Sequence, residues 1–191
     1  MADIVFNTGE TQTELKAKYN PEGSILRRAQ MRMLDMLLYF DQVCKEQKIP
    51  YRIDGGNVLG AVRHGGFIPW DDDIDVVIMR KDLHRLCNYL ITNPHPQYKL
   101  QTFKTDYGYV GAWVVLRDTK SEYIQDSNVH NARKYRGLQI DIFPYEDRVV
   151  KPLHKIAAKS QKKEWKMVCW EAHEGSTYGI YSATSNSTSH F

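Results

Sequence analysis

Four aspartates lie close together in one short segment. Apolar residues precede them, and a run of residues typical of a protein core follows them. From Phe67 to Met79 the segment reads FIPWDDDIDVVIM, with carboxylates at Asp71, Asp72, Asp73 and Asp75. Residues 74–79 are rich in β-branched side chains and predict a buried strand. Alternate side chains of a strand lie on the same face, so Asp73 and Asp75 are expected to project together. Asp71 joins them if the strand begins early.

Carboxylates this close raise one another's pKa unless a cation holds them. Because no Cys or His pattern accompanies them, the oxygen ligands favour Mg²⁺ or Mn²⁺ over zinc. A solvated turn is the plainer interpretation, but it does not explain two aspartates on a strand that enters the core. A calcium loop of the EF-hand type is excluded, because Val76 stands where that loop needs glycine and Asp82 where it needs glutamate.

A further carboxylate interrupts an apolar strand pattern later in the chain. In residues 138–143, Ile140 and Ile142 are expected on one face and Asp141 on the other. If this strand lies beside the first, three carboxylates converge. Such a trio can hold one or two divalent ions and leave a carboxylate to take a proton from a hydroxyl, as phosphoryl transfer requires. A structural aspartate at a strand end is the alternative for Asp141 alone.

A double glycine follows the short predicted strand at Tyr51–Ile53. Gly55 and Gly56, with Asn57 behind them, lead into a predicted helix over 57–63. Glycines let backbone N–H groups approach an anion, and the helix N-terminus adds its dipole. Gly55, Gly56 and Asn57 are therefore expected to bind the substrate. Arg63 on the same helix could neutralise a phosphate, although a surface salt bridge explains it equally well.

Helices and strands alternate around these residues. Ser24 is expected to cap a long amphipathic helix that ends at Ile49, and a second helix is expected over residues 83–91. Further strands are predicted at 98–103, 109–116 and 122–125. This order predicts an α/β fold (α+β mixed sheet), in which helices flank a mixed central β-sheet.

Composition divides the chain into four parts. These are a polar N-terminal arm at 1–23, a catalytic core at 24–148, a helical segment at 149–181 and a polar tail at 182–191. The helical segment is rich in lysine and could touch phosphates or an anionic membrane surface, but a solvated face is favoured.

The bulk properties exclude several classes of protein. The 191 residues are 42% hydrophobic and 26% charged, as in globular proteins, and a net charge of +3 does not predict nucleic-acid binding. Three widely spaced cysteines favour a reducing compartment. The sequence shows neither a secretory signal nor a membrane-spanning stretch, which predicts a cytoplasmic protein, with peripheral contact at the inner face of the membrane as an option.

Two motifs together resemble a known family. They are GGNVLGAVRHGGFIPWDDDIDV, from Gly55 to Val76, and IDIFP, from Ile140 to Pro144. Both closely resemble the LicD family, which is similar to the fukutin-related proteins and belongs to the nucleotidyltransferase-fold superfamily. The resemblance runs from about Arg27 to Pro144.

The resemblance implies a transferase that moves phosphocholine, or another phosphorylated alcohol, from a CDP-activated donor such as CDP-choline to a glycan hydroxyl, for example on lipopolysaccharide or teichoic acid. It assigns the glycine turn to Gly55 and Gly56 and the metal-binding pair to Asp73 and Asp75. It also assigns the third carboxylate to Asp141, which is expected to complete the metal site and to help deprotonate the sugar hydroxyl. Trp70 could stack on the cytosine, although packing is the commoner role for a tryptophan beside proline.

The sequence departs from the family pattern in two places. Asn57 follows the glycines where the superfamily often has serine or threonine, and the chain ends about 50 residues after the IDIFP motif. Two other functions stay open. One is a nucleotidyltransferase that attaches NMP to a small molecule or protein. The other is a non-catalytic relative that binds a glycan or a partner.

Overall fold

The computed structural model describes residues 5–7, 9–124 and 131–146. The chain divides into two compact units, residues 1–146 and 147–191. The second unit lies outside the described residues, and with it the helical segment and the polar tail that the sequence predicts. No helix in the described part of the chain is long and apolar enough to cross a membrane.

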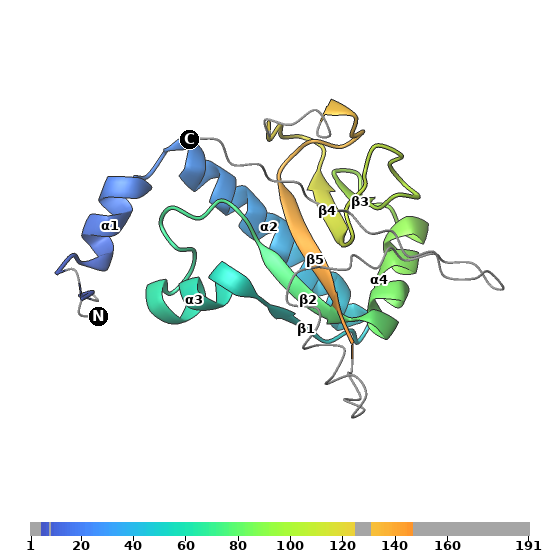
Figure 1. Cartoon of the computed structure of the whole chain (residues 1–191), viewed down its shortest axis with the longest axis horizontal. Helices are drawn as coiled ribbons and strands as arrows, with labels where there is room; N and C mark the ends of the chain where they lie inside the picture. The colour runs from blue at the N-terminus through green and yellow to red at the C-terminus, as the bar shows by residue number, and fades with distance from the viewer. Residues whose placement is uncertain (1–4, 8, 125–130, 147–191) are drawn as a thin grey trace, which may run out of the picture. The chain divides into compact units, whose positions relative to one another are not determined.

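Five strands form one mixed sheet in the order β1-β2-β5-β4-β3 (Figure 1). Their bounds are β1 Tyr51–Ile53, β2 Asp75–Met79, β3 Tyr98–Gln101, β4 Val114–Asp118 and β5 Gln139–Tyr145. The central pair, β2 and β5, is parallel, whereas the other neighbours are antiparallel. The predicted α/β class with a mixed central sheet is confirmed.

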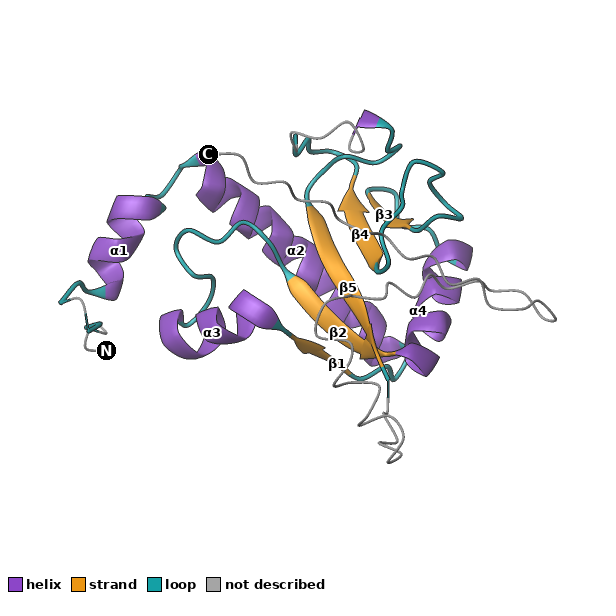
Figure 2. Ribbon diagram, viewed as in Figure 1, coloured by secondary structure: helices purple, strands orange, loops and turns teal. Residues whose placement is uncertain are grey.

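Two helices, α2 (Ile25–Glu46) and α4 (Arg80–Thr92), pack on one face of this sheet (Figure 2). The face they cover is apolar, because alternate residues of the two central strands point toward them. Those side chains are buried, namely Ile74, Val76, Ile78, Ile140 and Ile142. The intervening residues, Asp75 and Asp141 among them, therefore belong to the opposite face.

The helix ends follow the local signals in the sequence. Ser24 caps α2, and its Oγ accepts a hydrogen bond of 3.0 Å from the Arg27 N–H. The helix α4 ends at Asn93, the residue before Pro94. The helix α3 (Gly55–His64) begins two residues earlier than predicted, because Asp54 is its N-cap and both glycines join its first turn.

The polar arm contains a helix, α1 (Gln12–Tyr19), that we did not predict. A capping box begins it. The Thr11 N–H donates to Glu14 Oε2 at 2.7 Å, and the Glu14 N–H donates to Thr11 Oγ1 at 3.2 Å. The Thr-x-x-Glu spacing is readable in the sequence and could have revealed this helix.

Two predicted strands differ most from the structure, whereas β3 and β5 differ from their predicted bounds by one or two residues. Strand β4 begins only at Val114, because Tyr109 turns its side chain inward and donates a hydrogen bond of 2.9 Å from its hydroxyl to the Trp113 carbonyl. The described residues of the predicted strand at 122–125 form no strand. Tyr123 instead donates its N–H to the Arg136 carbonyl and its hydroxyl to Asp72.

Candidate active site

The register of the two parallel strands places Asp75 directly beside Asp141. The Asp141 N–H also donates a hydrogen bond of 2.9 Å to the Ile74 carbonyl, which fixes this alignment. Asp73 lies two residues before Asp75, just ahead of the strand, and is half-buried. The strand pairing on which a three-carboxylate site depends is therefore present.

The most closely spaced carboxylates of the described residues lie just before β2, at Asp71, Asp72 and Asp73. One oxygen from each of Asp71, Asp72 and Asp73 lies within 4.8 Å of the others. Asp72 accepts a hydrogen bond of 2.8 Å from the Tyr123 hydroxyl. In contrast, Asp71 Oδ2 is buried and has no hydrogen-bond donor among the described residues. Such an unsatisfied buried oxygen fits a site that receives a cation.

The electrostatics of Asp73 and Asp75 reflect the crowding. Burial, reinforced by repulsion from neighbouring carboxylates, raises the pKa of each from its ordinary value of 3.8 to about 6. No hydrogen bond or ion pair reaches either carboxylate from the part of the chain that the structure describes. A bound divalent cation would relieve this repulsion.

Asp141 has protein partners on both oxygens. Trp113 Nε1 donates to Oδ1 at 2.8 Å, and Gln139 Nε2 donates to Oδ2 at 2.7 Å. Burial raises the pKa of Asp141, while these hydrogen bonds and the charges of Arg117 and Arg133 act in the opposite direction. The protein itself therefore orients this carboxylate.

The two arginines are functional candidates that the sequence reasoning missed. Arg117 on β4 is fully buried, and it donates to Gln101 Oε1 at 2.7 Å and to the Gly137 carbonyl at 2.8 Å. Burial lowers its pKa to about 10. Arg133 places its guanidinium 5.5 Å from the centre of the Tyr109 ring. An arginine within the apolar run of β4 was a signal for Arg117, whereas nothing local marked Arg133.

The glycine turn packs directly against the acidic residues. A Cβ at Gly55, whose φ is 56°, would lie 3.2 Å from Asp75 Oδ2, and a Cβ at Gly56 would lie 2.8 Å from Asp71 Oδ2. The turn therefore needs glycine for close approach, and at Gly55 also for the left-handed backbone. The next side chain, Asn57, hydrogen-bonds to the backbone at Asp73 and Asp75.

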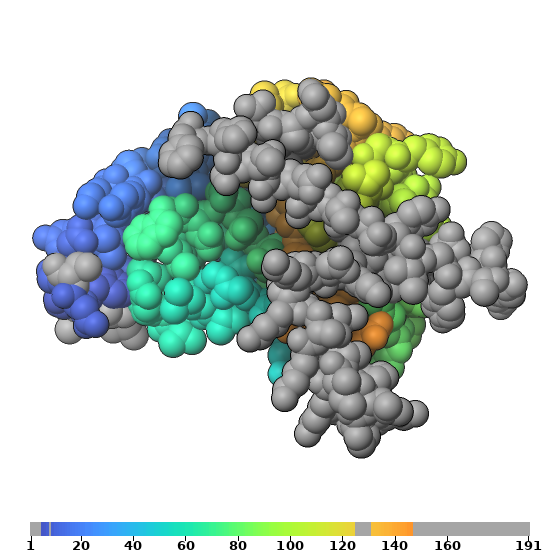
Figure 3. All heavy atoms as spheres, viewed as in Figure 1, coloured from blue at the N-terminus to red at the C-terminus, as the bar shows by residue number. Residues whose placement is uncertain are grey.

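Arg63 and Trp70, the other two predicted substrate-binding residues, both contact aromatic rings. The Arg63 guanidinium lies 5.4 Å from the centre of the Phe6 ring. Trp70 makes edge contacts with Tyr19, at 5.1 Å, and with His64, at 6.1 Å between ring centres. These contacts join α3 and the loop after it to α1 and to the segment that precedes α1, and the surfaces of these parts adjoin in Figure 3. The contacts described for Arg63 and Trp70 are thus aromatic packing.

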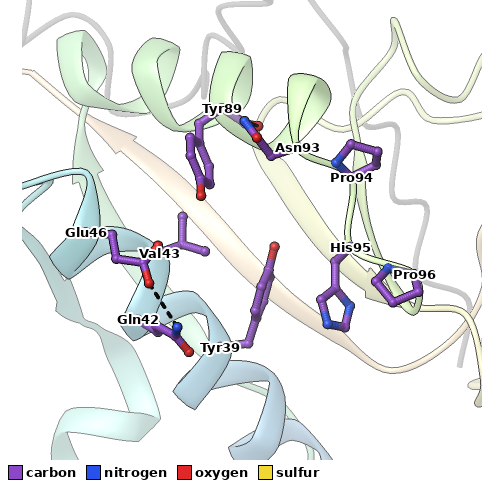
Figure 4. A pocket seen from close by; sticks show the side chains of 9 residues that line it. All are labelled: Tyr39, Gln42, Val43, Glu46, Tyr89, Asn93, Pro94, His95 and Pro96. Atoms are coloured by element: carbon purple, nitrogen blue, oxygen red, sulfur yellow. Dashed lines mark hydrogen bonds between the residues drawn. The ribbon is translucent and has the colours of Figure 1, made fainter.

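A pocket of about 390 Å³ lies on the helix side of the sheet (Figure 4). Side chains from α2, α4 and the turn after α4 line it, including Tyr39, Glu46, Tyr89 and His95. Because α2 and α4 cover the face opposite the carboxylates, this pocket is separate from the acidic site.

The donor set fits a hard divalent cation. Asp71, Asp72 and Asp73 bring one carboxylate oxygen each within 4.8 Å of the others, whereas no such group of three among the described residues includes Asp75 or Asp141. The carboxylates of Asp73 and Asp75 have no hydrogen-bond partner in the described part of the chain. Mg²⁺ and Mn²⁺ prefer such oxygen ligands. A Cβ at either glycine would crowd the oxygens of Asp71 or Asp75, so the turn keeps the approach to these oxygens free of side chains.

Comparison with known proteins identifies the family. The domain described as LicD/FKTN/FKRP, nucleotidyltransferase domain, matches residues 48–170, which is most of the chain. The matched region contains the glycine turn, the acidic strand and Asp141. The chain belongs to the LicD family, as the two motifs predicted.

Individual relatives support this assignment. The chain is 33% identical over 148 residues to the lipopolysaccharide cholinephosphotransferase LicD of Haemophilus influenzae, covering 73% of this chain and 56% of that protein. It is 26% identical over 131 residues to an uncharacterised protein of Rickettsia prowazekii, covering 56% of this chain and 47% of that one. The chain thus spans about half the length of these relatives.

A shorter match concerns a human protein. Over 45 residues the chain is 42% identical to the human ribitol 5-phosphate transferase FKRP, covering 24% of this chain and 9% of FKRP. The names of LicD and FKRP both describe the transfer of a phosphorylated alcohol.

Proposed function

We propose that this protein transfers a phosphorylated alcohol from a CDP-activated donor, such as CDP-choline, to a hydroxyl of a glycan acceptor. The observation that carries the proposal is the alignment of Asp75 with Asp141 on neighbouring parallel strands, beside a glycine turn, in a chain of the LicD family. The named activities of LicD and FKRP share this phospho-alcohol chemistry.

The proposed reaction exchanges one bond to phosphorus for another. The acceptor oxygen forms a bond to the phosphorus of the phospho-alcohol group, and the bond from that phosphorus to the bridging oxygen of the donor breaks. CMP leaves with the bonding electron pair, and the proton of the acceptor hydroxyl passes to a carboxylate.

Each proposed role follows from how the residue is held. The carboxylates of Asp73 and Asp75 lack hydrogen-bond partners among the described residues, so we assign them to a divalent cation with Asp141 beside them. When bound, Mg²⁺ or Mn²⁺ supplies positive charge against the donor pyrophosphate. Asp141, oriented by Trp113 and Gln139, accepts the proton. Gly55 and Gly56 admit the donor phosphates, because no side chain blocks the first turn of α3.

The direct test is release of CMP by the full chain. We expect CMP from CDP-choline or CDP-ribitol when Mn²⁺ and an acceptor such as lipopolysaccharide are present, and none after Asp75→Asn. Parallel reactions with nucleoside triphosphates test nucleotidyl transfer, since that activity would release pyrophosphate instead. Absence of metal-dependent turnover with every donor would identify a non-catalytic relative.

A cytoplasmic location, with the glycan acceptor reached at the inner face of the membrane, accompanies this proposal. Separation of membrane and cytosolic fractions with an antibody to the chain tests it. Recovery outside the cytoplasmic membrane and cytosol would contradict it.

A further inference from the structure

Asn57 occupies the position between the glycine turn and the acidic strand, and its side chain reaches across to that strand. Its Nδ2 donates a hydrogen bond of 3.1 Å to the Asp73 carbonyl. Its Oδ1 accepts a short hydrogen bond from the Asp75 N–H. The two polar atoms of one amide therefore hold the backbone on both sides of Ile74.

These contacts complete a cross-link between the turn and the strand. The Asp54 N–H donates to the Asp75 carbonyl at 3.0 Å, and the Asn57 N–H donates to the Asp54 carbonyl at 3.1 Å. The backbone of Asp75 is thus bonded on both its N–H and its carbonyl to residues at the start of α3. This geometry brings Asp75 Oδ2 within 3.2 Å of where a Cβ of Gly55 would lie.

Holding this backbone has an energetic reason. Asp73 and Asp75 carry carboxylates that repel each other, and without the clamp the segment that bears them could spread to separate the charges. Asp73 lies before β2 and has no ladder partner in the sheet, so the Asn57 amide is the described contact that ties its carbonyl to the rest of the fold.

We infer that Asn57 is a positioning residue, which sets the spacing of Asp73 and Asp75 for a divalent cation and does not itself bind the donor phosphates. The inference rests on the proposed function. It differs from the expectation that the residue after the glycines contacts the donor, because both polar atoms of the Asn57 side chain are engaged by the protein. Partners that orient metal ligands typically change metal affinity by about 10-fold to 100-fold.

The test measures Mn²⁺ binding without any donor. In the full chain, Asn57→Leu removes both hydrogen bonds at nearly constant volume, and Asn88→Leu on the exposed side of α4 makes the same change far from the site. Titration followed by the electron paramagnetic resonance signal of free Mn²⁺ should show an affinity weaker by about 10-fold for Asn57→Leu. The affinity of Asn88→Leu should equal that of the parent.

Kinetics of CMP release separate positioning from other roles. With Asn57→Leu, the Mn²⁺ concentration for half-maximal rate should rise in step with the dissociation constant. The rate at saturating Mn²⁺ should return close to the parent value, and the KM for CDP-choline should be unchanged. A general loss of structure would instead lower the folded fraction seen by circular dichroism, with unchanged Mn²⁺ affinity per folded molecule.

Two results would overturn the inference. Unchanged Mn²⁺ affinity in folded Asn57→Leu, with a raised KM for CDP-choline, would make Asn57 a donor-binding residue. A parent protein that binds no Mn²⁺ would overturn the metal site and the inference with it. By contrast, a parent that binds Mn²⁺ and loses affinity through Asn57→Leu, but releases no CMP, would contradict the proposed function and leave the positioning role supported.

Discussion

The start of β2 and the middle of β5 each present carboxylates to the same face of the sheet, but the protein treats them differently. The carboxylates of Asp73 and Asp75 repel their neighbours and receive no hydrogen bond from the described residues, and burial together with this repulsion raises their pKa values to about 6. Asp141 receives two hydrogen bonds and lies in the field of two arginines. The β2 carboxylates need an external cation, whereas the protein already satisfies the β5 carboxylate.

This contrast suggests that the β2 carboxylates and Asp141 have different roles. Unpartnered carboxylates are free to bind a cation, since no protein bond has to break. A carboxylate held on both oxygens keeps one orientation, which suits a group that must meet a hydroxyl at a defined position. Substitutions in one region at a time separate the two roles.

The largest effect is expected from Asp75→Asn. Removing this charge takes away half of the carboxylate pair on β2, so Mn²⁺ binding should be lost and CMP release should fall on the order of 10⁴-fold or more, as when charge stabilisation is removed from phosphoryl transfer. Mn²⁺ titration and CMP release measure this. Asp35→Asn on the exposed side of α2 is the matched control. A large fall in the melting temperature of the metal-free variant would instead mark Asp75 as structural.

The substitution Asp141→Asn tests the role of the β5 carboxylate as a general base. The Trp113 hydrogen bond can persist, and Gln139 can rotate its amide so that its unpartnered Oε1 accepts from the new Nδ2. We therefore expect CDP-choline still to bind with Mg²⁺, while turnover falls by about 10² to 10⁴-fold, the usual contribution of a general base. Calorimetry of donor binding and single-turnover rates provide the measurement. Near-normal CMP release with a proven acceptor would rule out the role of Asp141 as base.

A smaller effect is expected from Trp113→Phe. The ring can still pack against Phe143, whose centre lies 5.3 Å away, but the N–H donor to Asp141 is lost. Turnover should fall by about 10-fold, with Mn²⁺ affinity nearly unchanged, because the contact orients Asp141 and not the β2 pair. The rate of CMP release at saturating Mn²⁺ is the readout, and Tyr107→Phe at an exposed site is the control. Equal losses of Mn²⁺ affinity and turnover would show that Asp141 and the β2 carboxylates do not have separate roles.

The smallest effect concerns stability and pH. The folded pKa values of Asp73 and Asp75 lie near 6, above their ordinary value of 3.8. Without metal the folded state therefore binds more protons than the unfolded state between about pH 4 and 6, and stability from these groups falls as pH rises through that range. Metal-free Asp75→Asn should melt a few degrees higher than the parent at pH 7, and the two should converge near pH 4.

Melting curves by circular dichroism at both pH values check this expectation. Added Mn²⁺ should raise the melting temperature of the parent at pH 7 and leave that of the variant unchanged. A constant difference between parent and variant across the whole pH range would show that Asp75 carries no charge repulsion in the fold.

The sequence by itself determined the elements that carry the site. Alternation along residues 74–79 put Ile74 and Val76 in the core and the aspartates on the other face, which the burial pattern confirms. The Ser24 cap and the helical spacing after it defined α2. The two motifs identified the LicD family. These inferences succeeded because they depend on local periodicity and on side chains close together in the chain.

Only the tertiary structure decided which residues support the carboxylates. The order of the strands put β5 beside β2, and so aligned Asp141 with Asp75. The path of the loop before β4 brought the Trp113 N–H to Asp141, and α3 turned Asn57 toward the acidic strand and Arg63 toward Phe6. These partners are far apart in sequence, and their contacts depend on how sheet, loops and helices pack. Local propensity and spacing carry no information about that packing.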